Sequence, residues 1–256
     1  MKMNKLDEAE KHLRYLQDTM PDNHKDVISL YSKLGDLAFA KDDLTKSLHW
    51  YQRALKRKNQ TLKWDDLNIA DSYNSIGSVF AKQKAHEEAH KSYNKAMEIW
   101  KRNFGDEHLA IATCLSNIGT VYDSEKRYFD AHQCHNQALM IRRKHLPPDH
   151  PDVAISLHNL GVVHKNIGDL KKALQYFEES LLIKQKSLSF RHPSIALTWE
   201  NMASVYEQDL AFQKALMYYE KAAECYSSED ASTKKKLANV EQKVQRVKSK
   251  MPKRSR

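Results

Sequence analysis

A chain of 256 residues with 41% hydrophobic residues is long enough for one large helical array and needs no second globular core. It has only 6 glycines and 6 prolines, which suits a mostly helical protein. No run of 18 apolar residues occurs, the N-terminus lacks the apolar segment of a signal peptide, and three cysteines cannot all pair with one another. We therefore expect a cytoplasmic protein without membrane insertion or a disulfide framework.

The net charge of +9 is concentrated at the C-terminus. From Lys234 onward there are ten Lys or Arg residues and one acidic residue, Glu241, so that the preceding part is neutral. A neutral array does not supply the many phosphate contacts on which nucleic-acid affinity depends. Nucleic acid is therefore not an expected partner.

The first predicted element is a helix within residues 1–23, where Leu6, Ala9, Leu13 and Leu16 form an apolar stripe. Its place before His24 fits the second helix of an incomplete repeat, and it fits an N-terminal cap equally well. Both interpretations remain open.

From residue 24 onward, five consecutive segments share one sequence pattern. A polar residue opens each segment, a β-branched residue follows three positions later, and an aliphatic–small pair comes seven positions after that. Self-similarity at one fixed period is the mark of stacked repeats. The opening residues are His24, Asp66, His108, His150 and His192, so the expected repeats are 24–65, 66–107, 108–149, 150–191 and 192–233.

Each repeat is predicted to contain two helices. In residues 150–191 the apolar positions Val153, Leu157, Leu160 and Val163 share one helix face, and a break at residues 166–169 precedes a second helical pattern. A small residue stands on each helix, at Gly161 and at Ala173 in this repeat. Glycine inside a helix costs roughly 0.5–1 kcal/mol relative to alanine. Its recurrence at one repeat position therefore indicates that the two helices approach closely.

The C-terminal part is predicted to be a capping helix over residues 234–250, followed by a basic disordered tail over residues 251–256. Leu237, Val240, Val244 and Val247 lie on one helical face, which would cover the open end of the stack.

Two clusters of metal-ligating residue types occur, and both are better explained by the repeat. His86-Glu87-Glu88-Ala89-His90 fits the zinc-protease pattern H-E-x-x-H, but Ala89 is the small residue that every repeat requires. In the cluster of His132, Cys134 and His135, the last residue takes the slot of a packed ring in the other repeats. We expect no catalytic residue, no metal site and no cofactor, and therefore not an enzyme.

The order of aliphatic, small, aromatic, alanine, aromatic and small residues resembles the tetratricopeptide repeat pattern. It is carried by Ile118-Gly119, Tyr122, Ala131, His135 and Ala138, and again by Met202-Ala203, Tyr206, Ala215, Tyr219 and Ala222. The 42-residue unit with openings "HPDVA" and "HPSIA" is similar to the kinesin light chain type. The resemblance covers residues 25 to about 227. It implies an all-α, right-handed α-α superhelix of antiparallel helix pairs whose first helices line a concave groove.

Asparagines recur in that expected groove. Asn117, Asn159 and Asn201 are spaced by 42 residues, and Asn74 lies near the matching position of the second repeat. An asparagine side chain has a donor and an acceptor and can hold the backbone of an extended peptide. The resemblance implies this use, while the alternative is that the asparagines only join neighbouring helices. The other expected groove residues are Lys33, Lys82, Asp123, His158, Val162, Lys165, Leu197 and Glu200, with Val162, Leu197 and Ile155 forming an apolar anchor.

The sequence thus predicts a non-catalytic scaffold that binds a protein or peptide ligand, either an extended peptide or a partner helix, and no small-molecule substrate. Two alternatives remain open. One is a cargo adaptor of the kinesin light chain type, and the other is a regulatory array detached from a larger multidomain enzyme.

Overall fold

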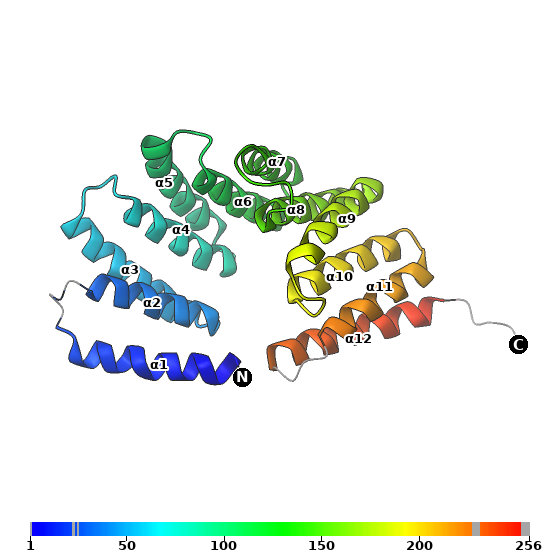
Figure 1. Ribbon diagram of the computed structural model, residues 1–256, viewed down its shortest axis with the longest axis horizontal. Helices are drawn as coiled ribbons and strands as arrows, with labels where there is room; N and C mark the ends of the chain where they lie inside the picture. The colour runs from blue at the N-terminus through cyan, green and yellow to red at the C-terminus, as the bar shows by residue number, and fades with distance from the viewer. Residues whose placement is uncertain (1, 22–23, 25, 227–230, 252–256) are drawn as a thin grey trace, which may run out of the picture. The chain divides into compact units, whose positions relative to one another are not determined.

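The computed structural model describes residues 2–21, 24, 26–226 and 231–251, and all regular structure in these ranges is helical (Figure 1). The all-α fold class predicted from the sequence is therefore confirmed. The chain forms two compact units, residues 1–134 and 135–256, and one helix, α7, passes from the first into the second. None of the helices in the described ranges is both long enough and apolar enough to cross a bilayer.

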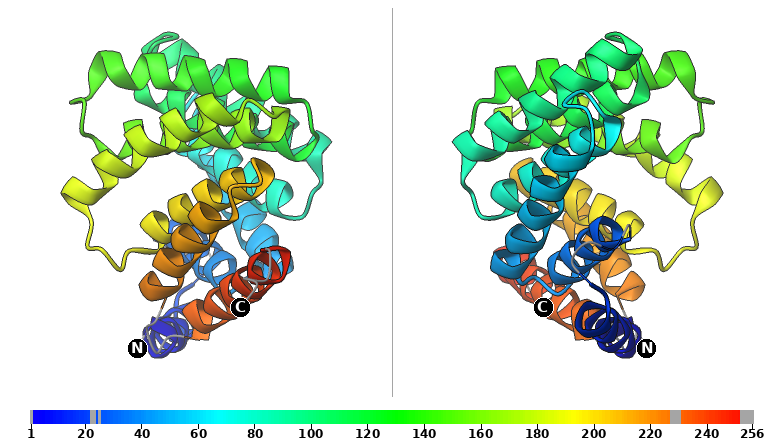
Figure 2. Two further views of the ribbon diagram at one scale, coloured as in Figure 1. Left: turned by 90° about the vertical axis from the view of Figure 1, so that its right-hand side faces the viewer. Right: turned by 90° about the vertical axis from the view of Figure 1, so that its left-hand side faces the viewer.

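Each unit is a succession of helices that pack on their neighbours in chain order (Figures 1 and 2). The first unit contains α1 (Lys2–Thr19), α2 (Val27–Ala40), α3 (Leu44–Thr61), α4 (Leu67–Lys82), α5 (His86–Phe104), α6 (Leu109–Ser124) and the start of α7 (Tyr128–His145). The second contains the rest of α7, α8 (Pro151–Ile167), α9 (Leu170–Ser187), α10 (Pro193–Gln208), α11 (Phe212–Cys225) and α12 (Ala231–Lys250). We call α2, α4, α6, α8 and α10 the first helices of their pairs. The basic tail predicted for residues 251–256 lies outside the described residues except for Met251.

The residues that open the second to fifth repeats cap the first helices, whereas α2 begins after Asp26, which makes no side-chain capping bond. In α6, α8 and α10 the capping residue is a histidine whose Nδ1 accepts a hydrogen bond from the backbone N–H two positions later, at 3.1–3.2 Å. Asp66 does the same for α4 through its carboxylate, at 2.8 Å. These side chains satisfy one of the N–H groups that every helix start leaves without an intrahelical acceptor. The recurring polar residue is therefore explained by capping.

The turn between the two helices of a pair is built the same way every time. One residue adopts a left-handed conformation, with φ between 59° and 87°, and these residues recur every 42 positions: Asp42, Lys84, Lys126, Gly168 and Leu210. Only glycine adopts this conformation without steric cost. The backbone geometry of the repeat thus persists where the residue type does not favour it.

The small residues of the first helices lie directly against rings of the second helices. A methyl group added at Gly35 would come 2.5 Å from Tyr51, one at Gly77 would come 2.7 Å from Tyr93, and one at Gly161 would come 2.6 Å from Phe177. Real Cβ contacts are never that short. The glycines are therefore required by the close packing of the helix pair, as the sequence predicted.

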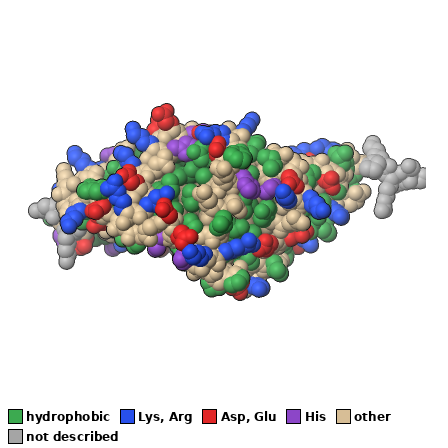
Figure 3. Space-filling model, turned by 90° about the horizontal axis from the view of Figure 1, so that it is seen from above, with side chains coloured by type: hydrophobic (Ala, Val, Ile, Leu, Met, Phe, Trp, Pro, Cys, Tyr) green, Lys and Arg blue, Asp and Glu red, His purple; other side chains and the backbone are tan. Residues whose placement is uncertain are grey.

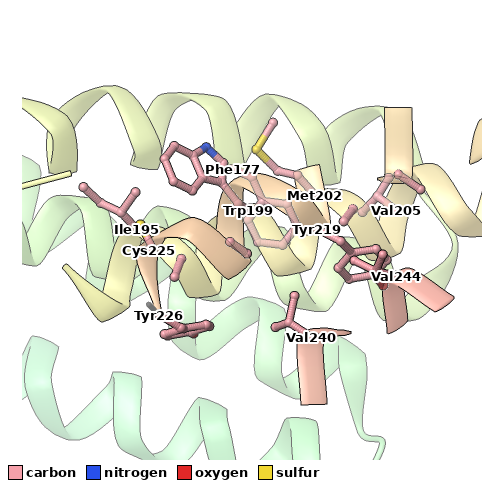
Figure 4. Close-up of a cluster of buried hydrophobic side chains, with 14 of the residues drawn as sticks. Phe177, Ile195, Trp199, Met202, Val205, Tyr219, Cys225, Tyr226, Val240 and Val244 are labelled. Carbon is pink, nitrogen blue, oxygen red and sulfur yellow. The ribbon is translucent and has the colours of Figure 1, made fainter. Parts of the chain in front are cut away.

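A continuous hydrophobic core in the second unit joins α9, α10, α11 and α12 (Figure 4). Phe177, Met202 and Tyr219 are buried in it, and Val240 and Val247 of α12 are fully buried. The first-helix glycine position would fall at Gln245 in α12, and this side chain is exposed. A further helix packed as α9 packs on α8 would meet the Gln245 side chain at the position where α2, α4 and α8 have glycine. We therefore propose that α12 closes this end of the array.

Candidate peptide-binding surface

A stripe of accessible side chains runs along each first helix. On α8 it consists of Ile155, Asn159 and Val162, whereas Leu157 and Leu160 between them are fully buried. The spacing of four and three residues places the stripe on one side of the helix. The matching residues of α10 are Leu197, Asn201 and Ser204. We call these stripes the first-helix face. Of the predicted groove residues, Asn159 and Val162 on α8 and Leu197 and Asn201 on α10 lie on it.

In the first unit, two of the predicted asparagines bind each other. The Asn117 Nδ2 of α6 donates to the Asn74 Oδ1 of α4 at 3.0 Å, and both side chains are half-buried. This bond joins neighbouring first helices and uses part of the hydrogen-bonding capacity of both amides. These two residues therefore have the helix-joining role that was the alternative to peptide contact.

In the second unit, Asn201 is also engaged. Its Oδ1 accepts from Lys165 Nζ at 2.8 Å, and its Nδ2 donates to the Leu197 carbonyl at 3.0 Å and lies 3.4 Å from His158 Nε2. Both ends of the amide thus have partners within α8 and α10. Lys165 and His158, predicted as groove residues, are held by the same network.

Asn159 differs from the other three asparagines. It is half-buried on α8, and none of the residues that the structure describes forms a hydrogen bond with its side chain. Ile155, one turn before it, is 44% exposed, and Leu197 on α10 is 46% exposed. The second unit thus offers an amide with a free donor and acceptor and two accessible aliphatic side chains.

His158 is buried beneath this face and must be neutral. The Thr198 hydroxyl donates its proton to the Ser194 carbonyl at 2.9 Å, so His158 Nδ1, at 3.2 Å from Thr198 Oγ1, must be the donor there. Its Nε2 is then an acceptor facing the Asn201 amide. Burial, together with the ammonium groups of Lys184 and Lys165, lowers the pKa of His158 to about 3. This residue orients its neighbours and carries no charge for a ligand.

The remaining charged groove residues are mostly paired. Lys82 contacts Asp42 at 2.6 Å and lies 4.7 Å from the centre of the Phe39 ring. Glu200 accepts from the Tyr226 hydroxyl at 2.9 Å and from Lys243 of α12 at 2.7 Å. Asp123 is half-buried on α6, whereas Lys33 is exposed on α2. On the side drawn in Figure 3, acidic and basic side chains are interspersed with hydrophobic ones.

Buried cations between successive repeats were missed in the sequence. Lys58 donates to the Asn68 carbonyl at 2.8 Å and the Ser72 hydroxyl at 2.7 Å, and Lys184 donates to the Thr198 hydroxyl at 2.9 Å. Burial lowers the pKa of Lys184 to about 8. Arg142 donates to the Ser156 hydroxyl at 2.7 Å in the same manner. These cations are spaced by multiples of 42 residues, which was the signal that could have revealed them.

The H-E-x-x-H histidines have a structural role. His90 Nε2 is 3.3 Å and His86 Nδ1 is 3.6 Å from the two carboxylate oxygens of Glu125, and His86 Nε2 is 2.9 Å from the Ser124 hydroxyl. They therefore connect α5 to the end of α6. His135 is buried, with 2% exposure. Within the described ranges, no group of three or more His, Cys, Asp or Glu residues is suited to hold a metal ion.

The helix pairs repeat along the chain. In each unit a glycine of the first helix packs against an aromatic ring of the second helix, and the first helices present a stripe of accessible side chains. These features define an α-helical repeat protein. Family models described as tetratricopeptide repeat match residues 26–100, 68–144 and 153–194. The chain therefore belongs to the tetratricopeptide repeat family and has the all-α solenoid fold of that family.

Three solved structures illustrate the likeness. BtubC (BKLC) from P. vanneervenii has a TM-score of 0.68 at 22% identity, over 87% of this chain and 90% of that chain. A Podosopora anserina structure of nearly identical TPR-like repeats, attributed to a kinesin light chain, has a TM-score of 0.62 at 17% identity, over 79% and 96%. A Rap protein complexed with competence and sporulation factor has a TM-score of 0.73 at 13% identity, over 93% and 69%. No curated protein matches the sequence.

Proposed function

We propose that this protein is a non-catalytic scaffold that binds an extended peptide along its first-helix face, with the main contact on α8 and α10. The observation that carries the proposal is the Asn159 side chain, whose amide is half-buried and forms no hydrogen bond with any described residue. An amide in that position can donate to and accept from one peptide unit of a ligand backbone. A partner helix, whose backbone groups are already paired, would leave this capacity unused.

The surroundings of Asn159 suit the side chains of an extended peptide. Ile155 and Leu197 are each nearly half exposed, and Val162 is half-buried one turn further along α8. Many binding interfaces combine a hydrophobic anchor with directional polar contacts. Accessible apolar side chains beside an amide that has no hydrogen-bond partner provide both. We therefore expect a ligand with an aliphatic or aromatic residue next to the peptide unit that Asn159 holds.

The rest of the face supports rigid recognition. His158, Asn201 and Lys165 form a hydrogen-bonded network below and beside Asn159, so the site is formed before the ligand arrives. Preformed sites lose less conformational entropy on binding. The Rap structure was obtained with competence and sporulation factor bound, which supports ligand binding by a helix array of this fold. The three free cysteines favour the cytoplasm as the site of action.

The proposal is tested by selecting peptides and then removing the amide. Extended 12-residue peptides would be selected from a phage library against the whole chain, and their affinities measured by calorimetry. We expect Asn159→Ala to weaken binding by roughly tenfold to a hundredfold, as the loss of a bidentate backbone contact implies. The circular dichroism spectrum of the variant should equal that of the unmutated chain.

The matched control is Asn117→Ala, which removes an amide of the same repeat position that is bound to Asn74. We expect this variant to lose some thermal stability and to retain most of its affinity. Equal affinities of the unmutated chain and Asn159→Ala for every selected peptide would refute the proposal.

A further inference from the structure

A hollow of about 510 Å³ opens between α2, α3 and α4 in the first unit. Its walls are polar and apolar in about equal measure, and the polar part includes the hydroxyls of Ser29, Ser32 and Ser72 and the carboxylates of Asp36 and Asp71. Lys58, which is 7% exposed, also lines it. The hollow adjoins the first-helix face, because Asp71 occupies on α4 the repeat position that Leu197 occupies on α10.

The equivalent position in the second unit shows why this space is open. Residues 126 positions later keep the buried cation and its hydroxyl partner, as Lys184 and Thr198. The equivalent of Ser32, however, is His158, and its imidazole is buried there against Thr198. Serine is much smaller than histidine. The first unit therefore has the same framework without the ring that occupies the second.

The charges of the hollow differ from those of the second unit in a way that specifies a ligand. Asp36 and Asp71 replace Val162 and Leu197. The Asp36 carboxylate accepts from the Tyr51 hydroxyl at 2.6 Å, but no described residue forms a hydrogen bond or ion pair with the Asp71 carboxylate. Burial raises the pKa of Asp71, although the Lys58 ammonium opposes this effect. Although Asp71 is exposed at the mouth of the hollow, two carboxylates and one ammonium give the lining a net charge of −1, which favours a cationic ligand.

Lys58 supplies a second feature directed at a ligand. Two of its three N–H groups donate to the Asn68 carbonyl and the Ser72 hydroxyl. No described residue accepts from the third. A buried ammonium that lines a hollow with an unused donor favours a ligand with a carbonyl acceptor.

We propose that this hollow is a specificity pocket for an arginine residue of the peptide ligand. The guanidinium donates to Asp71 and Asp36 at the place where the second unit holds an imidazole, and the arginine's main-chain carbonyl accepts from Lys58. A planar guanidinium suits carboxylates and hydroxyls placed side by side better than a single ammonium does. The proposal rests on the proposed function, since the ligand of the first-helix face supplies the arginine.

The test uses acetyl-Gly-Arg-Gly-amide as the probe and acetyl-Gly-citrulline-Gly-amide as its neutral, nearly isosteric counterpart. Each is titrated into the whole ¹⁵N-labelled chain, and backbone amide shifts are recorded. We expect saturable shifts in α2 and α4, with the citrulline peptide binding roughly tenfold or more weakly, as the loss of a charge-assisted hydrogen bond implies. Asp71→Asn should reduce arginine binding to the citrulline level.

Two further variants separate the pocket from a general charge effect. Glu98→Gln removes an exposed carboxylate of α5 that pairs with Arg102, and it should leave both affinities unchanged. Ser32→His places in the hollow the side chain that the second unit already accommodates, and it should abolish binding of both peptides while the thermal melt is retained.

Absence of shifts in α2 and α4, equal affinities of the two peptides, or equal effects of Asp71→Asn and Glu98→Gln would overturn the proposal. These outcomes are distinguishable from failure of the proposed function, because Asn159 lies in the other unit. Peptides selected on the whole chain would then still lose affinity in Asn159→Ala while the arginine probe failed to bind.

Discussion

Acidification should destabilise the second unit through His158. The pKa of this residue is about 3 in the folded chain and about 6.5 when the chain unfolds. Below pH 6.5 the imidazole of His158 is therefore protonated in the unfolded chain but not in the folded chain. The free energy of unfolding falls as the pH falls toward 3. Each pH unit in this window costs about 1.4 kcal/mol, so the loss at pH 5 is roughly 2 kcal/mol.

The structural reason is the direction of the hydrogen bonds. Protonation would place a second N–H on the ring opposite the Asn201 Nδ2, which is itself a donor. It would also add a positive charge close to the ammonium groups of Lys184 and Lys165. The buried ring can accommodate neither change without moving.

The assay is urea unfolding at pH 7 and pH 5, followed by circular dichroism, for the unmutated chain and for His158→Asn. The variant is less stable at both pH values because a smaller side chain leaves a cavity. Its stability should nevertheless change less between the two pH values, by roughly 2 kcal/mol, since the other titrating groups are common to both proteins. Equal changes in both proteins, or an NMR titration that places the pKa of His158 near 6.5, would refute the reasoning.

Two stability predictions test the packing and the turns. Ala173→Leu should lower the free energy of unfolding by roughly 1–3 kcal/mol, because Ala173 is fully buried where the helices of a pair meet; a thermal melt no lower than that of the exposed control Lys171→Leu would contradict this. Leu210→Gly should raise it by roughly 0.5–1 kcal/mol, because Leu210 is 72% exposed and left-handed at φ 59°. The reverse change at the equivalent turn, Gly168→Leu, should destabilise the chain, and a destabilised Leu210→Gly would argue against stored strain.

The repeat plan could be predicted because it depends on residues that recur. Gly35, Gly77 and Gly161 occupy one repeat position. Each lies against an aromatic ring of the second helix, and no larger residue fits there. The left-handed turns could not be predicted in the same way. Asp42 and Leu210 share a backbone conformation but no chemical property, since the neighbouring helices impose that conformation on whatever residue is present.

The hydrogen bonds of the candidate site could not be predicted from the sequence either. Asn117, Asn159 and Asn201 are equivalent in sequence, but only Asn159 has an amide without a hydrogen-bond partner among the described residues. The difference arises from side chains about 43 residues away on neighbouring first helices, such as Asn74 for Asn117. Lys58 was missed for a related reason, because a lysine is assumed to face solvent unless its buried partners are known.

The most direct test of the interaction surface is to map a selected peptide on the whole chain by hydrogen–deuterium exchange. We predict slower backbone amide exchange in α8 and α10, centred on Asn159 and Leu197, with α9 and α11 unchanged. A peptide footprint on α9 and α11 that leaves the first helices unaffected would contradict it.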